Sequence, residues 1–366
     1  MRILFVIPSL RPSSPIRWAV GLITRLSEKF DITVFILDPS SESTLFGLLE
    51  SKSNINVVFG AGRGPFAFFI NFLKLFRMKK GNEFESVMSL LFRADLLVAA
   101  CNFDSAIVSV RNDILKEYFY EFPYFAAKLF TSVHMWALNT VDICVFMSEK
   151  IKDEYQVLLK SQALYIPNGL DCDDVRVRLA PGNATRFYTA CAPSFVMVGS
   201  LIKRKQVFES VLLFKKLFDE GYTFRLNIVG EGPEAIRIRS FLECYPTFAS
   251  SVILHGHLSN PIPILEESDV FFMNSECEGI SRALMEAALL RKIIIARINP
   301  GVLELLSSGE ANYLFEGDSQ GLVLIRKVCE NMDSFRASEL PERFTIENCV
   351  QEYEELLLSV IDKERV

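Results

Sequence analysis

Short, nearly continuous apolar runs recur along the chain, and longer segments of helical periodicity separate them. Residues 3–7, 106–110 and 270–274 are typical runs, rich in Val, Ile, Leu and Phe with little polar alternation. Such runs indicate strands that are buried on both faces of a parallel sheet. Because strand, helix and strand repeat, the sequence predicts an α/β fold of doubly wound sheets. The other expected strands are residues 32–37, 55–59, 96–100, 143–146, 195–198, 224–229, 252–255, 293–296 and 312–315.

The pattern is interrupted at residues 166–171, which read Ile-Pro-Asn-Gly-Leu-Asp. Pro and Asn-Gly mark a turn there, and the stretch up to Pro193 is irregular. A chain of 366 residues also suits two domains better than one core. We therefore expect Rossmann-like domains over residues 1–168 and 169–345 that face each other across a cleft. Residues 346–366 are expected to form a C-terminal amphipathic helix that packs back toward the first domain.

Charge and cysteine content argue against several classes of function. The net charge is −6 and the pI about 5.4, so no nucleic-acid partner is expected, because nucleic-acid binders are more often basic. The eight cysteines form no Cys-x-x-Cys pair and only three histidines occur. We therefore expect free thiols in a reducing cytosol and no metal site.

Hydropathy predicts a cytoplasmic protein. The N-terminal apolar run ends at Pro8, too early for a signal peptide, and no apolar stretch is long enough to span a membrane. Residues 66–80 read FAFFINFLKLFRMKK and end in a cluster of basic side chains. This helix would either rest on an anionic membrane surface or be a core helix with a basic last turn. Peripheral membrane attachment is therefore one of two interpretations.

Two glutamates, Glu278 and Glu286, lie close to the strand expected at residues 270–274. A helix is expected from about Gly279 to Leu290, so the N–H groups of its first residues would attract a phosphate. Eight residues of helix would separate the two glutamates by roughly 12 Å, whereas a glycosidase carboxylate pair needs about 5–10 Å. The spacing suits one extended ligand that is gripped at both ends, such as a nucleotide sugar.

The arrangement Glu-x7-Glu, with Gly279 after the first glutamate, resembles the donor site of retaining GT-B glycosyltransferases of family four. The resemblance implies that Glu286 binds the ribose and Glu278 the transferred sugar, and that the N–H groups of Gly279, Ile280 and Ser281 face the diphosphate. Taken alone, the two glutamates would favour another interpretation, in which an exposed first-turn Glu is stabilised by the helix dipole and the second Glu is unrelated.

Further segments of the second domain resemble the same family. Residues 198–205, Val-Gly-Ser-Leu-Ile-Lys-Arg-Lys, resemble its phosphate loop, with Lys205 on the family's lysine. Residues 228–233 resemble its Gly-x-Gly-Pro turn, residues 166–171 its interdomain linker, and residues 300–304 its last helix start near the donor. The donor-binding candidates are Gly199, Ser200, Arg204, Lys205, Gly230, Gly279, Ile280, Ser281 and Glu286.

In the first domain, Arg111 and Asn112 occupy the strand end where family members often carry His-Asp. The resemblance implies that Arg111, together with Glu278 and Lys205, belongs to the catalytic set. A buried Arg-Asp pair that closes the strand is the other interpretation of Arg111. Asn112, Arg11 and Arg17 are the acceptor-side candidates.

This sequence departs from the family pattern at several positions. Ser200 stands where the family's phosphate loop has an arginine. Lys203 or Arg204 would then supply the missing positive charge. Arg291 and Ile293 stand where the family has Gly and Pro, and the first loop, residues 10–17, is not Gly-rich.

The predicted function is transfer of a sugar, with retained configuration, from a nucleotide diphosphate, preferably UDP, to a hydroxyl of a glycan or lipid-linked acceptor. The resemblance places it in bacterial surface polysaccharide synthesis, with no metal or other cofactor. The alternatives are a catalytically degenerate GT-B binding or scaffold protein, and a sugar-nucleotide epimerase or hydrolase.

Overall fold

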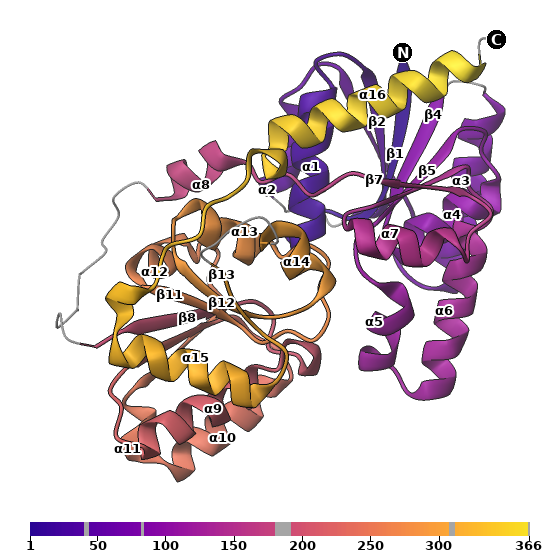
Figure 1. Ribbon diagram of the computed structural model, residues 1–366. Helices are drawn as coiled ribbons and strands as arrows, with labels where there is room; N and C mark the ends of the chain where they lie inside the picture. Colours follow the sequence, from indigo (N-terminus) through magenta and orange to yellow (C-terminus); the bar gives the residue numbers. More distant parts are fainter. Residues whose placement is uncertain (40–43, 82–83, 180–191, 307–311, 365–366) are drawn as a thin grey trace. The chain divides into compact units, whose positions relative to one another are not determined.

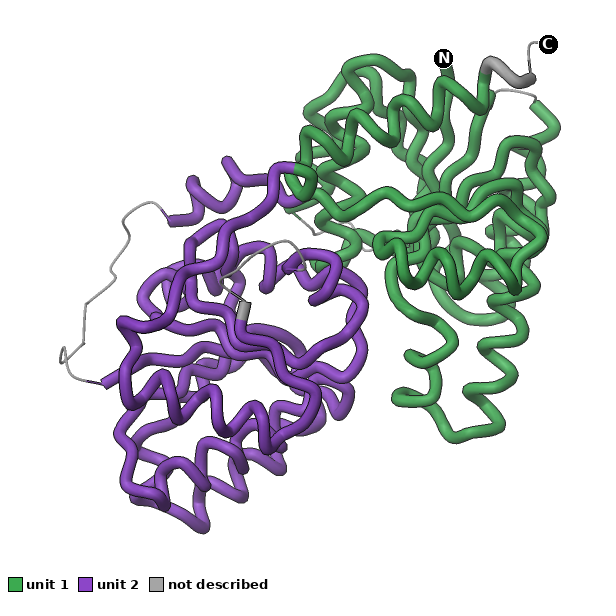
Figure 2. The backbone as a smooth tube through the Cα atoms, in the orientation of Figure 1, with its two compact units in different colours: residues 1–169, 343–366 green, residues 170–342 purple. Residues whose placement is uncertain are grey.

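In the computed structural model, the chain divides into two compact units, each an α/β layer structure (Figures 1 and 2). The structure describes residues 1–39, 44–81, 84–179, 192–306 and 312–364. Unit 1 comprises residues 1–169 and 343–366, and unit 2 comprises residues 170–342. Cys191 and most of the stretch expected to be irregular before Pro193 lie outside the described residues.

Unit 1 is built on a parallel sheet of seven strands in the order β3-β2-β1-β4-β5-β6-β7. Strand β1 is central, because Ile3 pairs with Ile32 on one side and with Ser86 on the other. A parallel sheet of this order needs crossover helices on both faces. The strands are β1 (Arg2–Ser9), β2 (Asp31–Asp38), β3 (Ile55–Phe59), β4 (Ser86–Leu90), β5 (Ala106–Val110), β6 (Ile143–Phe146) and β7 (Gln162–Tyr165).

Alternate residues of β1 enter different cores, which is what a sheet covered on both faces requires. Phe5 packs in a cluster with side chains of α1, α2 and α16, whereas Val6 packs in a cluster with those of α3 to α7. The helices of unit 1 are α1 (Ser14–Leu26), α2 (Thr44–Glu50), α3 (Pro65–Lys80), α4 (Phe92–Cys101), α5 (Ile114–Glu121), α6 (Tyr124–Leu138), α7 (Glu149–Gln156) and α16 (Ile346–Glu364).

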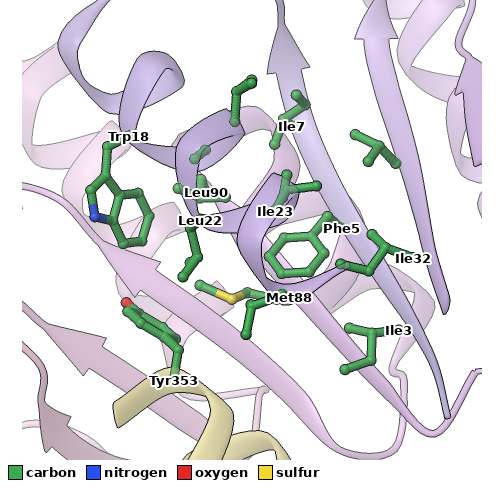
Figure 3. Close-up of a cluster of buried hydrophobic side chains, with 14 of the residues drawn as sticks. Ile3, Phe5, Ile7, Trp18, Leu22, Ile23, Ile32, Met88, Leu90 and Tyr353 are labelled. Carbon is green, nitrogen blue, oxygen red and sulfur yellow. The ribbon is translucent and has the colours of Figure 1, made fainter. Parts of the chain in front are cut away.

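The C-terminal helix α16 is part of the core of unit 1. Its Tyr353 is 1% exposed and lies 5.5 Å, between ring centroids, from Trp18 of α1. Figure 3 shows both rings beside the apolar side chains of β1 and α1. Tyr353 also shares a hydrogen bond of 3.1 Å with Ser109 at the end of β5. The last helix therefore helps to shape the carboxyl edge of this sheet.

Unit 2 contains a six-stranded parallel sheet in the order β10-β9-β8-β11-β12-β13. Phe195 and Met197 of β8 join one core cluster, and Val196 between them is buried on the opposite face. The strands are β8 (Ser194–Val198), β9 (Arg225–Val229), β10 (Val252–Gly256), β11 (Val270–Met273), β12 (Ile293–Arg297) and β13 (Asn312–Phe315).

Most helices of unit 2 connect its strands as crossovers, whereas α8 precedes β8 and α15 and η2 follow β13. The helices of unit 2 are α8 (Cys172–Arg178), η1 (Lys203–Lys205), α9 (Val207–Asp219), α10 (Glu234–Cys244), α11 (Pro246–Ala249), α12 (Ile262–Glu267), α13 (Arg282–Leu289), α14 (Pro300–Leu306), α15 (Asp318–Glu330) and η2 (Met332–Ser334). A further 3-10 helix, η3 (Glu342–Phe344), lies where the chain returns to unit 1.

The strand predicted at residues 96–100 is wrong. These residues lie in α4, which is buried around most of its surface and ends at Asn102 in a left-handed conformation. A helix buried on all sides and a buried strand present the same apolar run, so periodicity cannot separate them. The strand next to β1 is instead β4, whose sequence Ser-Val-Met-Ser-Leu includes two buried serines.

Helix α3, the basic-aromatic stretch, packs on unit 1 through much of its surface. Ala67, Asn71 and Leu75 are buried, and several of its phenylalanines pack against the core. Lys74 donates to the carbonyl of Phe59 at 3.1 Å, and Lys79 donates to the carbonyl of Asn102. Two of the basic side chains therefore already have partners within the unit.

Candidate active site

Two glycine turns bring the carboxyl ends of β8 and β9 into close contact. Gly199 and Gly230 have φ values of +152° and +143°, which side-chain-bearing residues rarely adopt. A Cβ on Gly230 would lie 1.8 Å from the carbonyl oxygen of Gly199. Only glycine at 230 permits this approach, so the candidate phosphate loop is held in place by the neighbouring turn.

The loop after β11 is buried and is held in place by Asn299 and by the first turn of α14. Asn299 donates to the carbonyl of Ser275 at 2.9 Å. A Cβ on Gly301, in the first turn of α14, would lie 1.6 Å from the carbonyl oxygen of Gly279. The loop that carries Glu278 is therefore backed by the beginning of α14, and its shape depends on a glycine at position 301.

Glu278 lies between two cations of the β8 loop. Its Oε1 is 2.9 Å from Nη1 of Arg204 and also forms an ion pair with Nζ of Lys205. Arg204 is buried and donates as well to the carbonyl of Cys277. The structure thus brings together two predicted catalytic residues, Glu278 and Lys205, with Arg204 beside them.

The surroundings of Glu278 keep it ionised. Burial by itself raises the pKa of the carboxyl. The charges of Lys205 and Arg204, with hydrogen bonds that include one from Ser275, outweigh burial and bring the pKa of Glu278 below its ordinary value. The result is a buried carboxylate that stays ionised at neutral pH, held by ion pairs with Arg204 and Lys205.

Helix α13 begins at Arg282, three residues later than the sequence predicts. Ser281 is the N-cap in an extended conformation, and its side chain makes no capping hydrogen bond. The helix starts late because the carbonyl of Gly279 lies against α14, and Ser281 accepts the bond from Met285 at 3.1 Å. The estimate of roughly 12 Å between Glu278 and Glu286 therefore rests on a wrong premise, since only part of that span is helical.

Glu286 sits in a second cluster of charges. It is 3% exposed, and its Oε1 accepts from Nε of Arg282 at 2.9 Å and from Nη1 of Arg178 at 3.4 Å. Asp174 of α8 contacts the same two arginines, at 3.1 Å from Arg282 and 3.4 Å from Arg178. Both candidate glutamates are therefore held by pairs of cations.

A small, open pocket of about 20 Å³ lies at the carboxyl ends of β8 and β11. Its lining includes Gly199, Ser200 and Lys205 from the first loop, and Asn274 and Ser275 from the second. Ligands of open α/β sheets bind at this edge. Ser200 is exposed, whereas Arg204 turns inward to Glu278.

In unit 1, Arg111 is a buried cation at the end of β5. Its guanidinium stacks on Trp18 with 3.7 Å to the ring centroid and donates to Asn168. Burial lowers the pKa of Arg111 to about 10. Among the residues that the structure describes, no carboxylate forms an ion pair with Arg111, and its Nε has no hydrogen-bond partner.

The interpretation of Arg111 as half of an Arg-Asp pair is wrong. Asp113 accepts from the hydroxyl of Tyr155 at 3.1 Å and pairs with Lys116 at 2.7 Å. The guanidinium of Arg111 stacks on the flat ring of Trp18 instead of pairing with the carboxylate of Asp113. A guanidinium can therefore be held here by stacking and by neutral acceptors.

The acceptor-side candidates are spread over two loops of unit 1. Asn112 donates to Glu117 at 2.7 Å. Arg11 is exposed and its backbone N–H donates to Ser9 at 3.4 Å, and Arg17 is half-buried in the first turn of α1. Both loops follow strands of the same sheet, β5 and β1.

Sequence reasoning did not identify Arg178, Asp174, Arg282 or Trp18. Arg282 and Glu286 are four residues apart on a helix, and this spacing predicts an ion pair between their side chains. Arg178 and Asp174 come from α8, more than a hundred residues earlier in the chain. Only the folded structure reveals that contact.

The described part of the chain has neither a group of metal ligands nor a membrane-spanning helix. There, no group of three or more His, Cys, Asp or Glu side chains is arranged to hold a metal ion. Within the same residues, no helix is both long enough and apolar enough to cross a bilayer. Of the seven cysteines that the structure describes, four are buried, namely Cys101, Cys144, Cys277 and Cys349.

Two parallel Rossmann-like sheets, each covered by helices, define the class of fold, which is that of the GT-B glycosyltransferases. The crystal structure of HepE from Anabaena in complex with UDP and glucose has a TM-score of 0.76 to this chain at 15% identity. The match covers 98% of this chain and 100% of that one.

Sequence comparison finds a family match within unit 2. Residues 192–337 match the family Glycosyl transferases group 1, and they include every donor-site candidate of unit 2. Residues 192–337, which make up most of unit 2, are thus similar to this family, and the chain as a whole has the GT-B fold.

Two curated relatives share part of their sequence with this chain. The capsular polysaccharide biosynthesis glycosyltransferase CapM of Staphylococcus aureus is 27% identical over 128 residues, which are 34% of this chain and 33% of CapM. The N-acetyl-alpha-D-glucosaminyl L-malate synthase of Bacillus anthracis is 26% identical over 174 residues, or 45% of each protein. The match thus spans from a third to less than half of the relatives' length.

Proposed function

We propose that the protein transfers a sugar from a nucleotide diphosphate, preferably UDP, to a hydroxyl of a glycan or lipid-linked acceptor. The observation that carries this proposal is the cluster of Glu278, Arg204 and Lys205 beside the pocket of unit 2. A diphosphate needs cations, and a sugar needs acceptors for its hydroxyls. This cluster supplies both at the edge of the sheet where ligands of such folds bind.

The chemistry asked of these residues is stabilisation of a leaving group. The bond between the anomeric carbon and the β-phosphate oxygen breaks, and its electron pair leaves with the diphosphate. The acceptor oxygen bonds to the anomeric carbon from the same face, which retains the configuration, and its proton passes to the leaving phosphate. Lys205 and Arg204 favour this step by neutralising the charge that develops on the diphosphate.

The ion pairs around Glu278 suggest how the donor would engage the site. A bound diphosphate competes with Glu278 for Lys205 and Arg204, because both offer anionic oxygens to the same cations. As the cations turn to the phosphate, the carboxylate becomes available to accept from sugar hydroxyls. Glu286 would accept hydrogen bonds from the ribose hydroxyls in the same way, after one of its two arginines has moved away from it.

The comparisons support this proposal without naming the substrates. HepE was crystallised with UDP and glucose, and CapM is a capsular polysaccharide biosynthesis enzyme. We extend both to this chain as a UDP-sugar donor and a role in bacterial surface polysaccharide synthesis. In unit 1, the buried Arg111 is assigned to a donor phosphate, and Asn112, Arg11 and Arg17 to the acceptor side.

Product analysis tests the proposal and its alternatives together. The purified protein is incubated with labelled UDP-sugars, with and without a lipid extract from bacterial membranes, and the products are separated. Label transferred only when extract is present, in the donor's anomeric configuration, is the expected result. Conversion of the donor without extract would indicate an epimerase or hydrolase. Tight nucleotide binding with no conversion under either condition would indicate a scaffold.

A further inference from the structure

The hairpin of α5 and α6 in unit 1 carries an unusual amount of exposed aromatic surface. Of the nine aromatic residues among the exposed large apolar side chains of the described chain, six lie between residues 119 and 136. Phe125 is the most exposed of them, at 85%. Figure 1 shows the two helices projecting as a pair from the rest of unit 1. Exposed apolar surface concentrated in one place marks a contact site.

The apolar side chains on α6 form an outward stripe. Phe125, Leu129 and Trp136 are 85%, 63% and 52% exposed, and their spacing of four and seven residues places them on one face of the helix. Ala127 and His134, on the opposite face, are buried against unit 1. The outward face of α6 is thus apolar, although it is exposed to solvent.

The hairpin is firmly attached to the core, so the exposed stripe is not the result of loose packing. The hydroxyl of Tyr118 on α5 shares a hydrogen bond of 2.8 Å with Nδ1 of His134 on α6. Nε2 of His134 lies 3.1 Å from Asp95, which accepts from Ser89 of β4 at 2.7 Å. A buried polar chain therefore runs from the hairpin into the central sheet.

The chemistry of the stripe indicates what covers it. Helix α6 contains one lysine, Lys128, and no carboxylate, and Lys128 is exposed beside the stripe. Aromatic side chains with polar atoms, here Tyr124 and Trp136, are favoured at the boundary between lipid headgroups and acyl chains. A lysine beside them is attracted to anionic headgroups. The exposed face of α6 is therefore apolar, aromatic and cationic, which suits an anionic bilayer surface. The glutamates of the hairpin, Glu117 and Glu121, lie on α5.

We propose that the α5–α6 hairpin docks the protein on a lipid bilayer, with Phe125, Leu129 and Trp136 inserted at the headgroup level. The hairpin follows β5 through Arg111 and Asn112. Docking therefore brings the carboxyl edge of the unit 1 sheet to the membrane, where a lipid-linked acceptor would be found. This last step rests on the proposed function, whereas docking itself does not.

Vesicle binding of the full chain tests the docking without any substrate. The probes are vesicles of equal parts phosphatidylethanolamine and phosphatidylglycerol, and vesicles of phosphatidylcholine alone. The chain has two tryptophans, and Trp18 is buried whereas Trp136 is exposed, so a change in emission reports the hairpin. We expect co-sedimentation with the anionic vesicles, a blue shift of emission, and quenching by lipids with brominated acyl chains.

A pair of matched variants locates the surface. Phe125→Ser with Leu129→Ser removes the stripe, and the expected result is a loss of vesicle binding of at least about tenfold. Phe66→Ser with Phe69→Ser removes two exposed aromatic residues of α3 and should leave binding unchanged. Trp136→Phe should keep binding but abolish the blue shift. Thermal unfolding checks that each variant is folded.

Three results would overturn the proposal. They are wild-type protein that binds neither kind of vesicle, a hairpin variant that binds as well as wild type, and loss of binding in the α3 variant instead. A wild-type dimer that becomes a monomer in the hairpin variant, with no vesicle binding, would assign the stripe to a second copy of the chain. Because no nucleotide sugar is used, these outcomes are independent of the transferase assay.

Discussion

Lys205 and Glu278 form a buried ion pair between the loop after β8 and the loop after β11. Arg204 completes the cluster from the same side as Lys205. Two cations on one carboxylate leave a positive charge at the pocket, which suits a dianionic or trianionic ligand better than a neutral one. The first two predictions follow from this cluster.

Replacing Lys205 by Met should lower turnover by about 10²–10³-fold, because one charge that stabilises the leaving diphosphate is lost. Lys216→Met is the matched control, since Lys216 is exposed in the last turn of α9 and does not line the pocket. Steady-state kinetics with a UDP-sugar and acceptor extract measure both. Equal activities of the two variants would remove Lys205 from the catalytic set.

The Glu278 cluster should also make stability depend on pH. The pKa of Glu278 lies below its ordinary value of 4.5, so the folded state favours the carboxylate. Its contribution is present above the ordinary pKa and is lost as the pH falls through the lower, folded pKa. The stability difference between wild type and Glu278→Gln should therefore shrink on acidification. Urea unfolding across the acidic range measures it, and a difference that grows on acidification contradicts the account.

Replacing Glu286 by Gln should weaken binding of UDP by roughly 10–100-fold, because hydrogen bonds to a charged group are lost. Asp174→Asn removes the other carboxylate beside Arg178 and Arg282 but is half exposed. Its affinity for UDP should stay near that of wild type. Titration calorimetry compares the three proteins, and a larger loss in the Asp174 variant would move the ribose site to α8.

Replacing Gly301 by Ala should destabilise unit 2 by about 1–3 kcal/mol and displace the Glu278 loop. The new methyl group would lie 1.6 Å from the carbonyl oxygen of Gly279, and backbone must move to make room. Gly317→Ala is the control, since nothing lies within 4 Å of a Cβ there. Thermal unfolding and UDP affinity should both fall in the first variant and be unchanged in the second. A Gly301→Ala variant with unchanged stability and unchanged UDP affinity would contradict the close packing of α14 on this loop.

Much of the fold could be predicted from apolar runs, because strands of a parallel sheet are buried on both faces. The runs that correspond to β1, β8 and β11 are of this kind. The errors in strand prediction occur where a buried strand contains polar residues, or where a buried helix is as apolar as a strand. Strand β4 hides two buried serines, which bond to Ser105 and Asp95, and α4 is as apolar as a strand.

The candidate site could be predicted only where its residues belong to local motifs. Lys205, Glu278 and Glu286 stand in such motifs, and the structure places Lys205 beside Glu278. The start of α13 was missed because a contact with Gly301 of another helix delays it. Arg178 and Trp18 were missed because they reach their partners through the fold, with no sequence signal.

The most direct test of a nucleotide-sugar site in unit 2 is a thermal-shift screen of the wild-type protein with UDP-, GDP- and ADP-sugars. A nucleotide-sugar site in unit 2 predicts a higher Tm with at least one of them, UDP-sugars most of all, and a reduced shift in Glu286→Gln and Lys205→Met. Absence of any shift with every nucleotide sugar would contradict it.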